Sequence, residues 1–400
     1  MKHVIIGVGA AGISAAETIR KNRPSDEIVM LSKDAAVHSR CMLHKFIGGK
    51  RNVEALSFIP SDFFEKNKIT WKPSTTVTKI DIKNKIIYYN DTNETYDKLL
   101  IATGAKSAFP PIKGLKASDS VYGLRDLYDA KAIREKAQTA KNIVIIGAGL
   151  VGLDAAYGLL EMGKKPVVVD MANCVLSANL DPRAAKTYQT KFEEVGCTFR
   201  FGAKVSSVQS DVNESVMSVT LNENEEIPCD LLIVAAGVKP ENSLLPSTEI
   251  NKFLSVGDEN VFVAGDASAF SESWPSAVEQ GQVAGLNMCN IKTVYDKNYP
   301  QKNTVNFFGV ASLSVGKFIE IETDGDTIDV REDKEGYKKV VLNGGVPVGI
   351  ILQGDISRSG FWQSLIKNKI NITEIPKSPW KISFADAYGL KENGEYEWNN

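Results

Sequence analysis

Cysteine and histidine are scarce in this 400-residue chain, which has five of the first and three of the second. The cysteines are scattered, odd in number and never spaced as C-x-x-C. This pattern argues against a disulfide framework, a cysteine zinc site and an iron–sulfur cluster. Cys41 and His44 have a metal-like spacing, but no second pair of ligands accompanies them. We therefore expect no metal site.

The chain also lacks a strong net charge and long apolar runs. Lys and Arg number 47 against 49 Asp and Glu, which gives a net charge of -2. Without a basic field, nucleic acid is a poor choice of partner. No apolar run reaches the ~18–20 residues of a membrane-spanning helix, and no signal-peptide pattern follows the first residues. We expect a cytoplasmic protein with no membrane span.

The strongest feature that is present is an internal repeat. Residues 4–16 read VIIGVGAAGISAA, and residues 144–156 read VIIGAGLVGLDAA. An apolar run followed by G-x-G-x-x-G predicts a strand, a tight turn and a helix whose N-terminus receives a pyrophosphate. Second strands are predicted at 27–31 and 167–170. Two such units predict two dinucleotides that react with each other, usually a flavin and a nicotinamide.

Three further segments read YDKLLIATGA at 96–105, LLIVAAGVKP at 231–240 and VFVAGDA at 261–267. Together with the repeat, they resemble the FAD-dependent pyridine nucleotide reductases, also called the pyridine nucleotide–disulfide oxidoreductase superfamily. Each is a predicted buried strand that ends in a small residue and glycine, so backbone can lie against a flat cofactor. The resemblance covers roughly residues 1–290 of the sequence.

This resemblance implies an α/β fold with two Rossmann-like dinucleotide-binding domains, the second inserted in the first. The FAD-binding domain is expected at 1–115 and 241–295, and the NAD-binding domain at 116–240. Residues 300–400 are expected to form a C-terminal α+β interface domain, with strands near 337–342 and 346–352. Dimerisation through this domain is left open.

One branch of the superfamily fits better than the others. ESWPSAVEQG at 272–281 resembles a segment of rubredoxin, putidaredoxin and ferredoxin reductases whose tryptophan, here Trp274, lies near the flavin ring. Arg125 and Lys45 match residues beside the flavin in that branch. Asp154 takes the place of a glutamate that pairs with this lysine. We interpret Lys45 and Asp154 as a pair, because a buried lysine needs a compensating carboxylate; two separate surface charges are the alternative.

Cys41 has two interpretations. CMLHKFIG at 41–48 also resembles the single-cysteine coenzyme A disulfide reductases and NADH oxidases, in which this cysteine reacts as a thiolate beside the flavin. Arg40 and Lys45 would favour that thiolate. The alternative is an inert cysteine packed in the flavin domain.

Motifs and resemblance together give the candidate site. Asp266 is implied to hold the ribityl chain of the flavin. Asp170 ends the second strand of the nicotinamide motif, where a carboxylate accepts from a ribose 2′-hydroxyl and repels a 2′-phosphate, so NADH is expected. The catalytic candidates are Lys45, Asp154 and Cys41. The cofactor-binding candidates are Gly7, Gly9, Ala10, Ala11, Gly12, Ser32, Lys33, Arg40, Val77, Ala102, Thr103, Gly104, Arg125, Gly265, Asp266, Trp274, Ala277, Gly147, Gly149, Leu150, Val151, Gly152, Asp170 and Gly237.

The resemblance implies an FAD-dependent NADH oxidoreductase. Hydride from NADH would reduce FAD, and electrons would pass to a rubredoxin- or ferredoxin-like carrier or to a partner redox subunit. The alternative sends both electrons through Cys41 to a disulfide or persulfide, or makes the protein an NADH oxidase. A non-enzymatic nucleotide-binding subunit is a third hypothesis, since a fold does not fix a function.

Aromatic residues mark the C-terminal region. Trp380, Phe384 and Tyr388 would share one face if the segment were helical. Two interpretations are open: an amphipathic segment packed on the protein itself, or a docking surface for a carrier or subunit.

Overall fold

The computed structural model describes residues 1–270, 273–296, 302–319, 326–334 and 336–398. These form two compact units, each described here by itself. The first comprises Met1–Ile146, Asp154–Pro166 and Val205–Lys297, and the second comprises Gly147–Leu153, Val167–Lys204 and Asn298–Asn400. Within the described ranges, no helix combines the length and apolar character that crossing a bilayer requires.

A six-stranded sheet forms the centre of the first unit, in the order β18-β19-β7-β1-β2-β3. Strands β19, β7, β1, β2 and β3 pair in parallel, and β18 joins antiparallel. The apolar runs predict this arrangement, because both faces of a parallel sheet are covered. The strands are β1 (Lys2–Ile6), β2 (Glu27–Leu31), β3 (Ile69–Lys72), β7 (Lys98–Ile101), β18 (Ser255–Val256) and β19 (Asp258–Val263).

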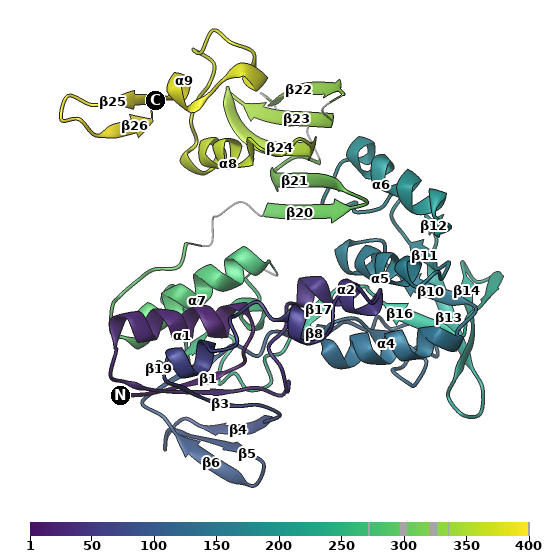
Figure 1. The fold of residues 1–400 in the computed structure, drawn as a ribbon, viewed down its shortest axis with the longest axis horizontal. Coiled ribbons are helices and arrows are strands. Elements are labelled where there is room, and N and C mark those ends of the chain that lie inside the picture. The colour runs from purple at the N-terminus through teal and green to yellow at the C-terminus, as the bar shows by residue number, and fades with distance from the viewer. Residues whose placement is uncertain (271–272, 297–301, 320–325, 335, 399–400) are drawn as a thin grey trace. The chain divides into compact units, whose positions relative to one another are not determined.

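Helices α1 (Ala10–Asn22) and α7 (Trp274–Met288) lie side by side against this sheet (Figure 1). Gly281 permits the approach, because a Cβ there would lie 2.2 Å from the Ala11 carbonyl oxygen. An antiparallel three-stranded sheet, β4-β5-β6, packs its apolar side chains with those on the other face of the sheet. Its strands are β4 (Val77–Asp81), β5 (Ile86–Tyr89) and β6 (Thr92–Thr95).

The first unit also contains elements of the second repeat. β9 (Val121–Gly123), β16 (Leu231–Val234) and β10 (Ile143–Ile146) pair in parallel. Two small antiparallel sheets complete its strands: β8 (Ala105–Ser107) pairs with β17 (Val238–Pro240), and β14 (Val216–Leu221) pairs with β13 (Val205–Ser210) and β15 (Glu225–Pro228). Its other helices are α2 (Leu43–Ile47), α3 (Phe63–Lys66), α4 (Leu127–Thr139) and α5 (Leu150–Glu161, in this unit from Asp154). Its 3-10 turns are η1 (Arg40–Met42), η2 (Glu54–Leu56) and η3 (Gly265–Ser268).

The second unit joins part of the second repeat to the C-terminal region. β11 (Val167–Asp170) and β12 (Thr198–Phe201) pair in parallel, and α6 (Pro182–Glu194) lies between them in the sequence. The C-terminal region is an antiparallel sheet in the order β20-β21-β24-β23-β22, with α8 packed on its apolar face. Its elements are β20 (Lys302–Phe307), β21 (Val310–Gly316), β22 (Asp326–Asp333), β23 (Gly336–Asn343), β24 (Val346–Gly354), α8 (Ser359–Asn368), η4 (Pro379–Lys381), α9 (Phe384–Ala387), β25 (Tyr388–Leu390) and β26 (Tyr396–Trp398).

The predicted elements agree closely with the structure. The second strands at 27–31 and 167–170 are β2 and β11, and the C-terminal stretches fall in β23 and β24. The three domain boundaries stay a prediction.

The aromatic C-terminal segment is not one helix, because it passes through η4, α9 and β25. Its side chains pack on α8: the Phe384 and Phe361 rings are 5.0 Å apart, and those of Trp380 and Trp362 are 5.5 Å apart. Packing on the protein itself is therefore what the structure shows for Trp380 and Phe384.

Candidate functional site

The two glycine loops repeat the same backbone geometry. The Gly7 N–H donates to the Leu31 carbonyl at 2.7 Å, and the Gly147 N–H donates to the Val169 carbonyl at 2.8 Å. Gly7 has a φ of 114° and Gly147 a φ of 108°, values that side-chain-bearing residues rarely adopt. Each loop is thus fixed to the end of its second strand, and the sequence repeat is also a structural one.

Open space lies beside the second glycine of each loop. A Cβ built on Gly9 or on Gly149 would meet nothing within 4 Å. Gly9 directly precedes α1 and provides no side-chain cap, so backbone N–H groups of the first turn are left for another acceptor. Helix N-termini with such free amides attract phosphate groups. Both loops therefore fit the pyrophosphate of a dinucleotide.

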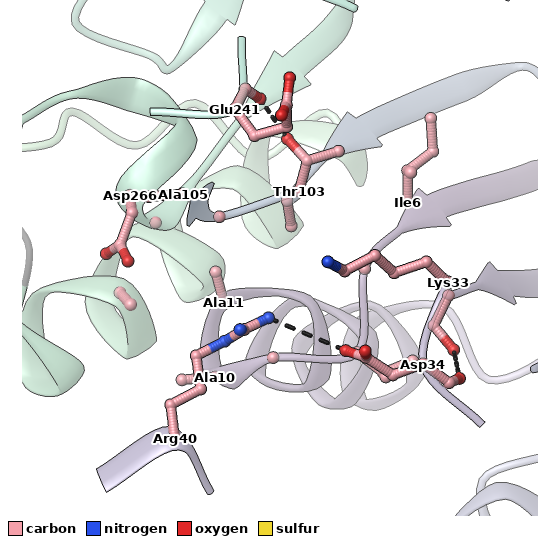
Figure 2. A pocket seen from close by; sticks show the side chains of 18 of the residues that line it. Ile6, Ala10, Ala11, Lys33, Asp34, Arg40, Thr103, Ala105, Glu241 and Asp266 are labelled. Carbon is pink, nitrogen blue, oxygen red and sulfur yellow. Dashed lines mark hydrogen bonds and ion pairs between the residues drawn. The ribbon is translucent and has the colours of Figure 1, made fainter. Parts of the chain in front are cut away.

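The first loop opens into a cavity of about 500 Å³ (Figure 2). The cavity brings together segments that are far apart in the sequence. Its lining includes Cys41 and sixteen of the predicted cofactor-binding residues: Gly7, Gly9, Ala10, Ala11, Ser32, Lys33, Arg40, Val77, Ala102, Thr103, Gly104, Arg125, Gly265, Asp266, Trp274 and Ala277.

Two predicted cofactor-binding residues of the first unit, Gly12 and Gly237, lie outside this lining, as do the catalytic candidates Lys45 and Asp154. A Cβ on Gly12 would lie 2.1 Å from the Gly7 carbonyl oxygen, so Gly12 serves the close packing of α1 on its own loop. The Gly237 carbonyl accepts the Ala108 N–H at 2.9 Å. The nicotinamide-motif residues Gly147, Gly149, Leu150, Val151, Gly152 and Asp170 lie in the second unit.

Arg125 is bound to Asp266 at the cavity wall. Its guanidinium donates to the Asp266 carboxylate, and its Nε donates to the Ala105 carbonyl at 3.0 Å. The Gly265 N–H donates to the Gln280 side chain at 3.0 Å, and Gln280 is fully buried. The Q-G end of the 272–281 motif therefore holds the Gly265–Asp266 turn in place. One Asp266 oxygen remains for a hydroxyl donor.

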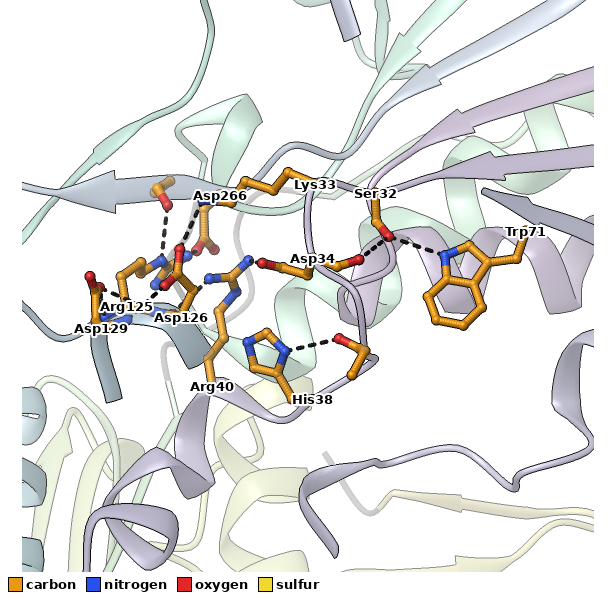
Figure 3. A network of polar contacts seen from close by, with 12 residues as sticks. Ser32, Lys33, Asp34, His38, Arg40, Trp71, Arg125, Asp126, Asp129 and Asp266 are labelled. Carbon is orange, nitrogen blue, oxygen red and sulfur yellow. Dashed lines mark hydrogen bonds and ion pairs between the residues drawn. The ribbon is translucent and has the colours of Figure 1, made fainter. Parts of the chain in front are cut away.

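Arg40 provides a second cation to the cavity (Figures 2 and 3). Its guanidinium donates to the Arg125 carbonyl at 2.7 Å and lies 3.8 Å from the Asp34 carboxylate. Burial and the neighbouring Arg125 lower the pKa of Arg40, which stays a cation at neutral pH. A long 3.8 Å pair leaves this cation able to receive an anionic group of a ligand.

Two carboxylates at the start of α4, the N-cap Asp126 and Asp129 of the first turn, complete the network (Figure 3). Lys33 donates to Asp126 at 2.8 Å, and this bond lowers the pKa of Asp126 although burial acts to raise it. Burial, together with the adjacent Asp126, raises the pKa of Asp129 to about 6. Asp126 and Asp129 also form the capping box of α4. Lys33 is thus tied to this helix start.

The expected contact between Lys45 and Asp154 takes a different form in the structure. Lys45 Nζ lies 4.0 Å from Glu161 Oε1 and 4.5 Å from the centre of the Tyr157 ring. Asp154 Oδ1 instead lies 3.2 Å from His44 Nδ1. Burial raises the pKa of Asp154 to about 8, and Lys45 acts through space to lower it. The two residues are therefore coupled electrostatically, without an ion pair between them.

Cys41 lines the cavity and is exposed. The surrounding protein raises the pKa of its thiol, Asp154 raises it further, and Arg125 acts in the opposite direction. This differs from the expectation that Arg40 and Lys45 would stabilise a thiolate. A raised pKa keeps the sulfur as a thiol at neutral pH, and the thiol is the weaker nucleophile.

Asp170 is fixed at the end of β11 by two backbone groups. Its carboxylate accepts the Ala148 N–H at 2.5 Å and the Ala172 N–H at 2.7 Å. The first of these comes from the glycine loop itself. The carboxylate is thereby held next to the loop, where it can meet the ribose of a dinucleotide bound there.

Two descriptions of known protein families match this chain. Residues 1–281 match the family described as pyridine nucleotide-disulphide oxidoreductase. The chain belongs to this family. Residues 302–370 match a second description, the rubredoxin NAD+ reductase C-terminal domain.

Relatives of this oxidoreductase include proteins of quite different size. The chain is 29% identical over 396 residues to the NADH-dependent phenylglyoxylate dehydrogenase subunit epsilon of Aromatoleum evansii, covering 94% of this chain and 93% of that one. It is 28% identical over 392 residues to a nitrite reductase [NAD(P)H] of Bacillus subtilis, covering 94% of this chain. The chain spans about half of that relative, 48% of its length.

Solved structures support the fold of the oxidoreductase. The NAD-dependent persulfide reductase from A. fulgidus has a TM-score of 0.81 at 24% identity, covering 94% of this chain and 78% of that one. At this identity the likeness concerns the fold. It confirms the α/β class with Rossmann-like dinucleotide-binding sheets and a C-terminal antiparallel sheet.

Sequence reasoning missed several residues that line the cavity of the oxidoreductase. His38 and Thr75 come from loops that follow β2 and β3, and Glu241 follows the motif at 231–240. The Thr103 hydroxyl donates to the Glu241 carbonyl at 2.6 Å. The position of Glu241 directly after Pro240 was a usable signal. The segment after β2 also contains the predicted residues Ser32, Lys33 and Arg40, but no sequence pattern marks His38 or Thr75.

Proposed function

We propose that the chain is an FAD-dependent NADH oxidoreductase that passes electrons to a carrier protein or to a partner redox subunit. One observation carries this proposal: the two glycine loops share one hydrogen-bond pattern and leave open space at Gly9 and Gly149. Two pyrophosphate sites in one chain are expected when the two bound dinucleotides react with each other. The family membership agrees with FAD and NADH as the pair.

The residues of the chain bind and orient these cofactors. The bound flavin supplies the chemistry of accepting a hydride and releasing single electrons. The loop at Gly7–Gly9 and the Arg40 guanidinium would hold the FAD pyrophosphate, and Asp266 would accept from the ribityl hydroxyls. Asp170 would accept from the NADH ribose. Trp274 and Cys41 lie on the cavity wall and would limit the access of water.

An electron carrier or redox subunit as acceptor has two supports. The C-terminal region matches the rubredoxin NAD+ reductase C-terminal domain, and the relative from Aromatoleum evansii is named as a subunit. A homodimer through the C-terminal domain is part of the proposal. A cytoplasmic location is also proposed, because all five cysteines are free thiols, as expected in a reducing compartment.

A second function has a specific observation in its favour. Cys41 is exposed and lines the same cavity as the flavin-binding residues. Electrons would then reach a disulfide or persulfide through its sulfur. The raised pKa of the thiol argues for the carrier route, because the thiolate is the reactive form.

The variant Cys41→Ser separates the two functions. We expect it to keep its flavin, to be reduced by NADH and to reduce a one-electron acceptor within about twofold of the wild-type rate, since in this route electrons leave the flavin directly. Rapid-mixing absorbance under anaerobic conditions measures both steps. Cys174→Ser is the matched control, because the pKa of that thiol is also raised. A Cys41→Ser protein that reduces its flavin normally but has lost every acceptor activity contradicts the carrier route.

A further inference from the structure

His44 and Asp154 meet where α2 packs against α5. His44 is 7% exposed, and its Nδ1 lies 3.2 Å from Asp154 Oδ1. This contact is not a hydrogen bond, and the backbone of Cys41 also acts on the imidazole, where it raises the pKa of His44 against the effect of burial. Gly158 makes the packing close, because a Cβ there would lie 2.7 Å from the His44 carbonyl oxygen. The backbone therefore holds the imidazole and the carboxyl group together.

Lys45, the cation next to this pair, contacts Glu161 instead of Asp154. Lys45 Nζ lies 4.0 Å from Glu161 Oε1, and Glu161 Oε2 is buried without a hydrogen-bond partner in the described part of the chain. The Lys45–Glu161 contact is therefore loose, and Lys45 still acts electrostatically on Asp154. A flexible four-carbon stem lets a lysine exchange one carboxylate for another nearby.

We propose that His44 is a positioning residue for Asp154 and that the two side chains share one proton at neutral pH. When this proton is lost, Lys45 leaves Glu161 and pairs with Asp154. The pair would thus control the charge beside Cys41 at the cavity wall. The proposal rests on the proposed function only where it concerns the nicotinamide. The Lys45–Asp154 pair expected from the sequence would then be the form present at high pH.

The titration directions agree with this arrangement. Burial raises the pKa of Asp154 to about 8, and burial, Lys45 and Arg51 lower the pKa of His44 to about 4. Between these values the carboxyl is protonated and the imidazole is neutral. The titratable and charged groups around the pair are Lys45 from α2, Tyr157 and Glu161 from α5, Cys41 from η1, and Arg51 from the loop after α2. From α4, Arg134 lies over the Phe46 ring of α2.

A consequence for the nicotinamide follows from its charge. The oxidised ring carries a positive charge that NADH lacks. When Asp154 ionises, the cluster of Asp154, Lys45 and Glu161 gains one negative charge, whichever carboxylate Lys45 contacts. This charge would favour NAD+ over NADH by about fivefold if it acts as two charges about 4 Å apart do in bulk water. The ratio of the two dissociation constants should therefore change as the pH rises through about 8.

Nuclear magnetic resonance of the histidines tests the pair without pyridine nucleotide. The chain has three histidines, so single variants assign every imidazole signal. In the flavin-loaded protein we expect the His44 signal to shift with a midpoint near pH 8, following Asp154, and D154N to abolish that step. H3Q is the matched control, since His3 is also buried and its Nε2 lies 2.9 Å from Asp26 Oδ2 in another part of the unit.

The outcomes separate this proposal from the proposed function. A His44 signal that does not shift between pH 6 and about 9, or an unchanged shift in D154N, overturns the proton-sharing pair even if NADH reduces the flavin normally. If the step is present but the NAD+ to NADH ratio is the same at pH 6.5 and 9, the pair does not face the nicotinamide. H44Q, which keeps a polar side chain but cannot share the proton, should shift the pH at which this ratio changes while the protein retains its flavin. A ratio in H44Q that still changes as in the wild type overturns the role of His44.

Discussion

Gly9→Val is expected to yield a folded protein that has lost its flavin. The structure leaves open space at Gly9, with an extended backbone that any residue adopts, so the side chain itself causes no clash within the protein. The same side chain would occupy the place proposed for the FAD pyrophosphate. We expect flavin per chain to fall by about tenfold or more, equivalent to roughly 1.4 kcal/mol or more of binding free energy. Absorbance of the purified protein measures flavin content, and circular dichroism checks the fold.

The matched variant is Gly149→Val in the second loop. Gly149 has the same open surroundings as Gly9. This variant is expected to retain FAD but to be reduced very slowly by NADH, because the NADH pyrophosphate loses its place. The pair of variants therefore assigns each loop to one cofactor. Loss of FAD in Gly149→Val with FAD retained in Gly9→Val would reverse the assignment, and two variants with normal flavin and normal reduction would contradict it.

Asp170→Arg is expected to reverse the nucleotide preference from NADH to NADPH. In the wild type, two backbone N–H groups fix the carboxylate beside the second loop, where it repels a 2′-phosphate. An arginine removes this repulsion and binds phosphate directly. We expect the ratio of kcat/KM for NADH over NADPH to fall by about 100-fold or more, roughly 2.7 kcal/mol. Steady-state kinetics with both nucleotides measure it.

Asp170→Asn isolates the effect of charge in this comparison. The amide keeps the shape of the side chain and can still accept one of the two backbone N–H groups. NADH discrimination should therefore weaken without reversing. Because one N–H group loses its acceptor, stability should fall by about 1–3 kcal/mol. A wild-type preference for NADPH, or an unchanged ratio in both variants, contradicts the role of Asp170.

The sequence predicts those parts of the site that depend on local pattern. The glycine loops, β2 and β11 follow from short motifs whose backbone geometry is set within a few residues, and the structure confirms them. The segments around Gly104 and Asp266 were found through resemblance, and the cavity brings them together. Their roles in binding a cofactor stay predictions.

Contacts between distant elements could not be predicted in the same way. His44 and Asp154 meet because Gly158 lets α2 approach α5, and nothing near either residue in the sequence indicates this. Lys45 is expected from the sequence to contact Asp154, but its Nζ lies 4.0 Å from Glu161 Oε1, about two turns further along α5. The Cys41 thiol illustrates the same limit: the neighbouring cations in the sequence favour a thiolate, whereas desolvation by the surrounding protein and the Asp154 charge raise the pKa of the thiol.

Anaerobic titration of the purified protein with NADH tests the central claim most directly. The account predicts a yellow protein that releases FAD on denaturation and whose flavin absorbance is bleached by about one NADH per chain, as expected for a two-electron transfer between two bound dinucleotides. A protein that holds FMN or no flavin, or whose bound FAD keeps its absorbance in excess NADH, would contradict the account.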